Sequence, residues 1–180
     1  MEDVEVKCYK KDYPRPQFVR NQWVNLNGKW DFGFDEQNCG EKKEWFRDFP
    51  GELEIQVPFT YETKLSGIED ESSHENIWYR RTLEIAPDML HEKRLMLHFE
   101  GSDFITKVWL NGKFAGEHRG GYTRFSFDIT DLVSEGENQL VVKVEDSEDI
   151  QQPRGKQRWV GENFGCWYVQ TTGIWKMVWL

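Results

Sequence analysis

The last nine residues of the chain alternate between two sets of side chains, and both sets are largely apolar. After Gly173 the two sets are Trp175, Met177 and Trp179, and Ile174, Lys176 and Val178. A period of two is the pattern of a β-strand, here one that is apolar on both faces. A strand that ends on a bare Trp179-Leu180 invites mispairing at its edge. We therefore expect the polypeptide to continue, with this chain as the N-terminal module of a longer protein.

The remaining sequence is typical of a series of short strands without a convincing helix. Strand-like segments recur every 8–15 residues or so, roughly at residues 30–34, 54–57, 77–85, 95–99, 104–110, 125–129 and 140–144. Asn111-Gly112 is the strongest short hairpin signal, since both positions of such a turn need positive φ. In segment 77–85, Arg81 falls on the inward side, which predicts a buried or ligand-facing guanidinium. Eight or nine such strands predict an all-β fold, a jelly-roll β-sandwich.

Size and charge limit the classes of protein that the chain can represent. Its 180 residues form one domain of ordinary size, with an extended arm over residues 1–20 and a jelly-roll domain over residues 21–180. The net charge of −9 and the pI near 5.0 argue against nucleic acid and anionic membranes as partners. No apolar stretch approaches the ~20 residues of a membrane span. The three cysteines are far apart and lack ligand spacing, so we expect reduced thiols in a cytoplasmic protein, with no metal and no cofactor.

Residues 151–170 differ from the rest because they form a long segment without periodicity, and such loops are often functional. The segment mixes basic and amide side chains with aromatic ones. Sugar sites need planar hydrogen-bonding groups for hydroxyl pairs beside flat apolar faces. We therefore predict that five residues contact carbohydrate: Arg154, Arg158, Trp159, Trp167 and Tyr168. The alternative is that Trp159, Phe164 and Trp167 plug the end of the sandwich while the charged side chains are solvated.

Five segments of the chain also form a recognisable series. They are LNGKWDF at residues 26–32, VPF at 57–59, WYRRTL at 78–83, FEGSDFITKVWLNG at 99–112 and TTGIWKMVWL at 171–180. In this order they resemble the N-terminal domain of glycoside hydrolase family 2, which contains β-galactosidases, β-glucuronidases and β-mannosidases. The match runs from about residue 20 to residue 180.

The resemblance implies a galactose-binding-domain-like jelly roll that is the non-catalytic N-terminal domain of a retaining β-glycosidase. The parent enzyme would hydrolyse terminal β-linked sugars in carbohydrate metabolism, using two glutamates on a catalytic barrel. Such a (β/α)₈ barrel takes about 250 residues and does not fit in this chain, so we expect no catalytic residue here. The implied partners are a carbohydrate and the remaining domains of the parent glycosidase, itself a candidate homo-oligomer.

Trp167 marks a departure from part of the family. Some β-galactosidases place an aspartate six residues before the glycine of the closing strand, where it contacts the sugar, and here that position holds Trp167. This departure disfavours a galactosidase-type contact. In the family the loop equivalent to residues 151–170 leads toward the active site, so we expect it to form part of the pocket rim or to pack on the barrel. Two alternatives remain: a free-standing lectin-like module using the same loop, and a scaffold domain that touches no sugar.

Overall fold

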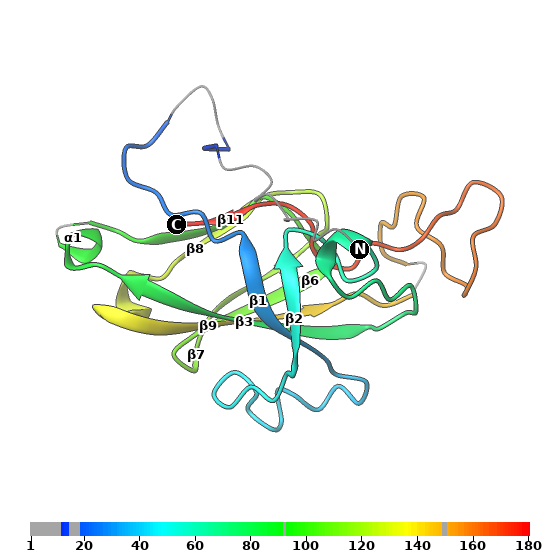
Figure 1. Ribbon diagram of the computed structural model, residues 1–180, viewed down its shortest axis with the longest axis horizontal. Coiled ribbons are helices and arrows are strands. Elements are labelled where there is room, and N and C mark those ends of the chain that lie inside the picture. Colours follow the sequence, from blue (N-terminus) through cyan, green and yellow to red (C-terminus); the bar gives the residue numbers. More distant parts are fainter. Residues whose placement is uncertain (1–11, 15–18, 92, 149–150) are drawn as a thin grey trace, which may run out of the picture.

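The computed structural model describes residues 12–14, 19–91, 93–148 and 151–180, and its main layer is a six-stranded antiparallel sheet (Figure 1). The strand order in this sheet is β2-β1-β3-β9-β6-β7. In chain order the strands are β1 (Gly28–Phe34), β2 (Leu53–Val57), β3 (Asn76–Ile85), β6 (Ile105–Leu110), β7 (Lys113–Arg119) and β9 (Gly136–Glu145). The predicted hairpin joins β6 to β7, and both Asn111 and Gly112 have positive φ, as that turn requires.

The second layer is smaller and is made of shorter strands. It contains a three-stranded sheet of order β11-β4-β8 and a two-stranded sheet of order β10-β5. These strands are β4 (Met96–Phe99), β5 (Ser102–Asp103), β8 (Phe125–Asp128), β10 (Gly173–Ile174) and β11 (Val178–Trp179). Helical structure in the described residues is limited to α1 (Pro87–Leu90) and the two 3₁₀ turns Lys64–Ser66 and Thr130–Leu132. The expected all-β, jelly-roll-like sandwich is confirmed.

The closing run is two short strands, so the expectation of one continuous strand is wrong. Ile174 pairs with Ser102 in one small sheet, whereas Val178 pairs with Phe99 in the other. Between β10 and β11, the backbone amides of Trp175 and Lys176 both donate hydrogen bonds to the Gly101 carbonyl, each at 3.3 Å. The Trp175 indole donates a hydrogen bond to the carbonyl of Gly121 at 2.8 Å, which directs this side chain away from the core and toward the base of loop 151–170.

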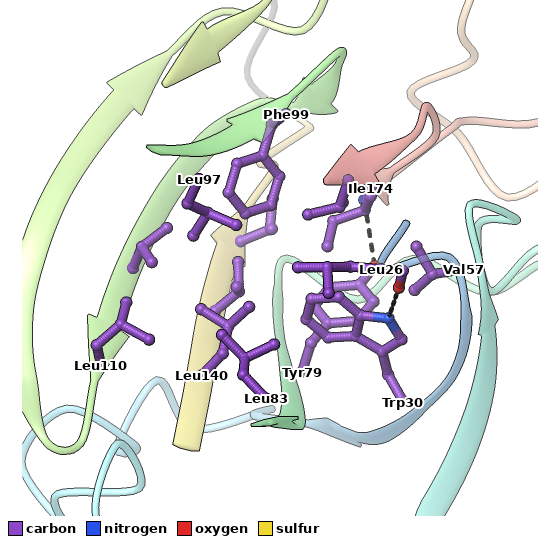
Figure 2. Packing of buried hydrophobic residues seen from close by; sticks show 14 of the residues in the cluster. Leu26, Trp30, Val57, Tyr79, Leu83, Leu97, Phe99, Leu110, Leu140 and Ile174 are labelled. Atoms are coloured by element: carbon purple, nitrogen blue, oxygen red, sulfur yellow. Dashed lines mark hydrogen bonds between the residues drawn. The ribbon is translucent and has the colours of Figure 1, made fainter. Parts of the chain in front are cut away.

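The main core lies between the two layers, and its residues come from alternating positions on the strands (Figure 2). Trp30 and Tyr79 meet edge to face, with 6.3 Å between ring centroids. The Trp30 indole donates a hydrogen bond to the Leu26 carbonyl at 2.8 Å, so this large side chain is buried with its polar atom satisfied. Arg81 lies on the inward side, as predicted, and donates to the same carbonyl at 2.8 Å. That guanidinium therefore braces the turn that leads into β1.

A second apolar cluster covers the outer face of the large sheet. Its buried members are Phe49, Trp78, Trp109 and Val141, and Trp45 and Phe46 pack on them. The segment between β1 and β2 supplies this cover and is anchored by Asp35, which accepts a hydrogen bond from the Trp78 indole at 3.1 Å. Because both faces of the sheet are covered, neighbouring residues such as Trp78 and Tyr79 are both fully buried. Many of the tryptophans therefore serve packing.

Of the predicted arm over residues 1–20, only residues 12–14 and 19–20 lie within the described part of the chain. There Tyr13 packs edge-on against Trp23 and Trp179, with ring centroids 5.4 and 5.2 Å apart. The remainder of the predicted arm lies outside the described residues. Among the residues that are described, no helix is long and apolar enough to cross a membrane.

Candidate functional site

Residues 151–170 fold back on themselves and project from the sandwich, as Figure 1 shows in orange to red. Two pairs of backbone hydrogen bonds close the segment. Arg158 donates to the Tyr168 carbonyl at 2.6 Å, and Tyr168 donates to the Lys156 carbonyl at 2.8 Å. Nearer the tip, Phe164 and Trp167 bond to each other's carbonyls at 3.2 and 2.8 Å. The segment is therefore an ordered projection, which we call the 151–170 loop.

Three aromatic side chains gather at the tip of the 151–170 loop. The Trp159 ring lies 5.1 Å from Phe164 and 4.7 Å from Trp167 between centroids, and the last two rings are 6.3 Å apart. All three side chains are half-buried. Because they pack mainly on one another, part of each ring stays open to solvent. The structure thus brings the predicted Trp159 and Trp167 together, with Phe164 as their support.

Arg158 is turned inward, beneath this aromatic tip, and is 6% exposed. Its guanidinium donates to Gln170 and Asn163 side chains at 3.1 Å each and to the Glu71 carbonyl at 2.7 Å. Gln170 adds a hydrogen bond of its own to the Glu71 carbonyl at 3.0 Å. Arg158 thus ties the loop to the connection between β2 and β3. Its donors face protein groups, whereas a sugar contact had been predicted from the sequence.

Replacing Arg158 with leucine is expected to loosen the 151–170 loop while the sandwich stays folded. Hydrogen bonds from a charged donor contribute about 1.5–3 kcal/mol, and their loss leaves the oxygen of the buried Gln170 side chain without its donor. A loss of about 2 kcal/mol in the free energy of local opening should speed chymotrypsin cleavage within the loop roughly 30-fold. The exposed Lys156→Leu variant is the matched control. Equal cleavage rates in the two variants would show that Arg158 does not fasten the loop.

Arg154 and Tyr168, the other two predicted residues, line a pocket of about 260 Å³ on the flank of the loop. We call it the flank pocket, and its lining also includes Asp103, Tyr122, Lys156, Gln157 and Trp175. Tyr122 and Tyr168 are 53% and 59% exposed. The sequence reasoning missed Asp103, Tyr122 and Gln157. No local signal marks the first two. The pairing of β10 with β5 brings Asp103 to the loop, and the hydrogen bond from the Trp175 indole to the Gly121 carbonyl brings Tyr122 there.

Buried carboxyl groups lie beneath the base of the loop. Asp103 accepts a hydrogen bond from the Gln157 amide at 2.8 Å, and burial together with nearby Asp146 raises its pKa to about 7. Burial also raises the pKa of Asp146, which accepts a hydrogen bond from the Thr172 hydroxyl at 3.0 Å. Glu62 accepts one from the Thr172 amide at 2.9 Å, and burial raises its pKa to about 7. Within the described residues, no three His, Cys, Asp or Glu side chains are grouped as metal ligands.

Comparison with known proteins identifies a matching family and several relatives of this chain. A family model described as glycosyl hydrolases family 2, sugar binding domain, matches residues 23–178. A β-galactosidase of Thermoanaerobacter pseudethanolicus is 31% identical over 159 residues, which is 87% of this chain and 19% of that protein. A β-glucuronidase of Bacteroides fragilis is 35% identical over 136 residues, or 73% of this chain and 18% of that protein. The chain thus spans about a fifth of the length of these curated relatives.

Solved structures give the same result. A β-glucuronidase from Lactobacillus rhamnosus superimposes with a TM-score of 0.64 at 29% identity, covering 72% of this chain and 22% of that one. The β-glucuronidase from Ruminococcus gnavus in complex with D-glucuronic acid has a TM-score of 0.71 at 22% identity, and covers 89% of this chain and 30% of that one. The second likeness is one of fold alone. With a family model matched from residue 23 to residue 178, the chain belongs to glycoside hydrolase family 2 and corresponds to its sugar-binding domain.

Proposed function

We propose that this chain is the non-catalytic N-terminal domain of a retaining β-glycosidase, and that it docks on the catalytic barrel and shapes the rim of the substrate pocket. The parent enzyme hydrolyses terminal β-linked sugars. The observation that carries the proposal is the 151–170 loop, an ordered projection with half-open aromatic rings at its tip. The relatives that this domain resembles are β-galactosidases and β-glucuronidases more than four times its length.

The tip is suited to the apolar face of a sugar. Aromatic rings offer flat apolar surfaces on which the C–H face of a pyranose can stack. Trp167 holds the position at which some β-galactosidases carry an aspartate, and an indole cannot accept a hydrogen bond from a hydroxyl. The sugar contact in this protein is therefore one of stacking at the rim. Arg158 supports this contact from below by fixing the loop.

The test is hydrolysis of a nitrophenyl β-glycoside by the full-length parent protein. We expect Trp167→Ala to lower kcat/KM roughly tenfold, because an aromatic contact contributes about 0.5–1.5 kcal/mol beyond its buried area. Phe114→Ala removes an aromatic ring that is 55% exposed on β7, and it should leave kcat/KM unchanged. An unchanged kcat/KM in the Trp167 variant would rule out the rim contact.

The non-catalytic part of the proposal has a test of its own. Retaining glycoside hydrolysis needs two carboxyl groups about 5–5.5 Å apart at the scissile bond, one of them a nucleophile. We place both of these groups outside this chain. The 180-residue chain by itself should therefore release no nitrophenol above the buffer rate. Measurable turnover, lost when an acidic residue of this chain is replaced, would overturn the assignment.

A further inference from the structure

The flank pocket is built from three segments that are distant in sequence. Asp103 comes from β5, Tyr122 follows β7, and Tyr168 belongs to the 151–170 loop. Trp175 closes the pocket, meeting Tyr122 edge to face at 6.2 Å between centroids. The hydrogen bond from the Trp175 indole to the Gly121 carbonyl fixes this wall. The aromatic lining is therefore preformed, although the two tyrosines are more than half exposed.

The lining of the pocket includes the Asp103 carboxyl, one oxygen of which has no hydrogen-bond partner. Asp103 is 3% exposed, and its Oδ2 accepts the hydrogen bond from Gln157. Its Oδ1 is buried and has no hydrogen-bond partner. A buried acceptor without a donor costs about 1–3 kcal/mol. This oxygen faces Gly121 and is closed to solvent, so the Asp103 carboxyl supports the pocket from beneath, and the polar side chains open to a ligand are those of Gln157 and Lys156. Lys156, an exposed residue of the lining, adds a donor.

These features select the ligand class. The volume of about 260 Å³ is below the roughly 300–1,000 Å³ of sites for drug-sized ligands, so it suits a single ring. Tyrosine and tryptophan faces beside an amide side chain are a combination that pyranose recognition uses. Arg154 is already engaged, since it donates to the carbonyls of Ser147 and Arg158 and faces Asp103, and Lys156 is exposed to solvent. A ring without a charge therefore fits best.

We propose that the flank pocket is a binding site for one neutral pyranose and that the site functions in this domain without the catalytic barrel. The inference rests on the sugar-binding role proposed above but uses a different surface. Trp167 packs into the aromatic tip, whereas the adjacent Tyr168 lines the flank pocket. The parent enzyme would thus contact sugar at two places on the domain, the rim of its catalytic pocket and this flank.

The test is a titration of the 180-residue chain with methyl β-galactopyranoside, methyl β-glucopyranoside and glucuronic acid, followed by amide and indole NMR shifts. We expect saturable shifts at Gly121, Gln157 and the Trp175 indole with one of the neutral glycosides, and a dissociation constant in the millimolar range. Tyr168→Ala and Tyr122→Ala should each weaken binding five- to tenfold or so, because each removes a stacking face. Phe114→Ala, an exposed aromatic on β7, is the matched control and should bind as the unmodified chain does.

Three results would overturn the inference. The first is the absence of shifts with both neutral glycosides, and the second is a set of shifts confined to Trp159 and Trp167 at the tip. The third is tighter binding of glucuronic acid than of either neutral glycoside, which would make the ligand an anion. None of these results bears on hydrolysis by the full-length protein with Trp167→Ala. Failure of this site and failure of the proposed function can therefore be told apart.

Discussion

Replacing Gly173 with alanine is expected to lower the free energy of unfolding by about 2–4 kcal/mol. At this residue φ is +90°, a conformation that strains side chains with a Cβ by about 1 kcal/mol or more. An added Cβ would also lie 2.1 Å from the Tyr79 hydroxyl and 2.8 Å from a methyl carbon of Ile77. Both neighbours are fully buried on β3, and overpacking of this kind typically costs about 1–3 kcal/mol.

Thermal unfolding of the 180-residue chain, followed by circular dichroism, measures this effect. For a domain of this size each kcal/mol shifts Tm by about 2–4 °C, so we expect a fall on the order of 10 °C. Gly136→Ala is the matched control, because φ there is +86° but nothing lies within 4 Å of an added Cβ. The control should lose only the strain contribution, near 1 kcal/mol. Equal losses of unfolding free energy in the two variants would mean that β10 moves away from β3 at little cost to accommodate the added Cβ.

A double substitution isolates the contact with Tyr79. Its hydroxyl accepts the hydrogen bond from the Ile174 amide at 3.3 Å, the dashed line between these residues in Figure 2. Tyr79→Phe removes that acceptor but also removes the atom nearest to the new Cβ. Gly173→Ala combined with Tyr79→Phe should therefore be less destabilised than the sum of the two single variants. Gly173 lies just beyond the end of the 151–170 loop and pairs with Asp103, so this contact also sets where the loop returns to the sandwich.

The fold could be predicted from the sequence because its strands follow simple periodic rules. Alternation over residues 77–85 placed Leu83 and Ile85 inward, and both are buried in the core. Asn111-Gly112 predicted its hairpin from turn chemistry alone. The closing run was predicted less well. Alternation cannot show that the Gly101 carbonyl takes two successive amides, or that Trp175 turns outward to Gly121, and these contacts divide the run into two strands.

The candidate site could be predicted only in outline, because a loop without periodicity does not reveal where its side chains point. Five residues were selected by chemical type, and the structure distributes them over three environments. Trp159 and Trp167 lie at the tip, Arg158 lies beneath it, and the remaining pair lines the flank pocket. Asp103 and Tyr122 could not have been added from sequence, since contacts between distant segments bring them there: the pairing of β10 with β5 and the hydrogen bond from Trp175 to Gly121.

Lowering the pH from about 8 to about 5 is expected to stabilise the domain. Burial raises the pKa of both Glu62 and Asp103 to about 7, from ordinary values of 4.5 and 3.8. Between the ordinary and the raised value, the folded chain keeps a proton that the unfolded chain releases. The free energy of unfolding therefore falls as the pH rises through this window, and the loss is complete above about pH 7. His118 opposes the trend, because burial lowers its pKa.

The total change is expected to be on the order of 3 kcal/mol, since one pKa unit corresponds to about 1.4 kcal/mol and local relaxation lowers the full value. Denaturant unfolding of the 180-residue chain across the pH range measures it. Glu62→Gln keeps an oxygen for the Thr172 amide but removes the buried charge, so it should be more stable than the unmodified chain at pH 8 and about equal at pH 5. Glu137→Gln changes the same charge at an exposed position on β9 and should keep the original dependence of stability on pH.

If stability instead rises toward pH 8, or if Glu62→Gln leaves the dependence of stability on pH unchanged, these carboxyl groups are ionised in the folded domain at little cost. The base of the 151–170 loop would then tolerate charge, and its attachment to the sandwich through Thr172 would be independent of pH.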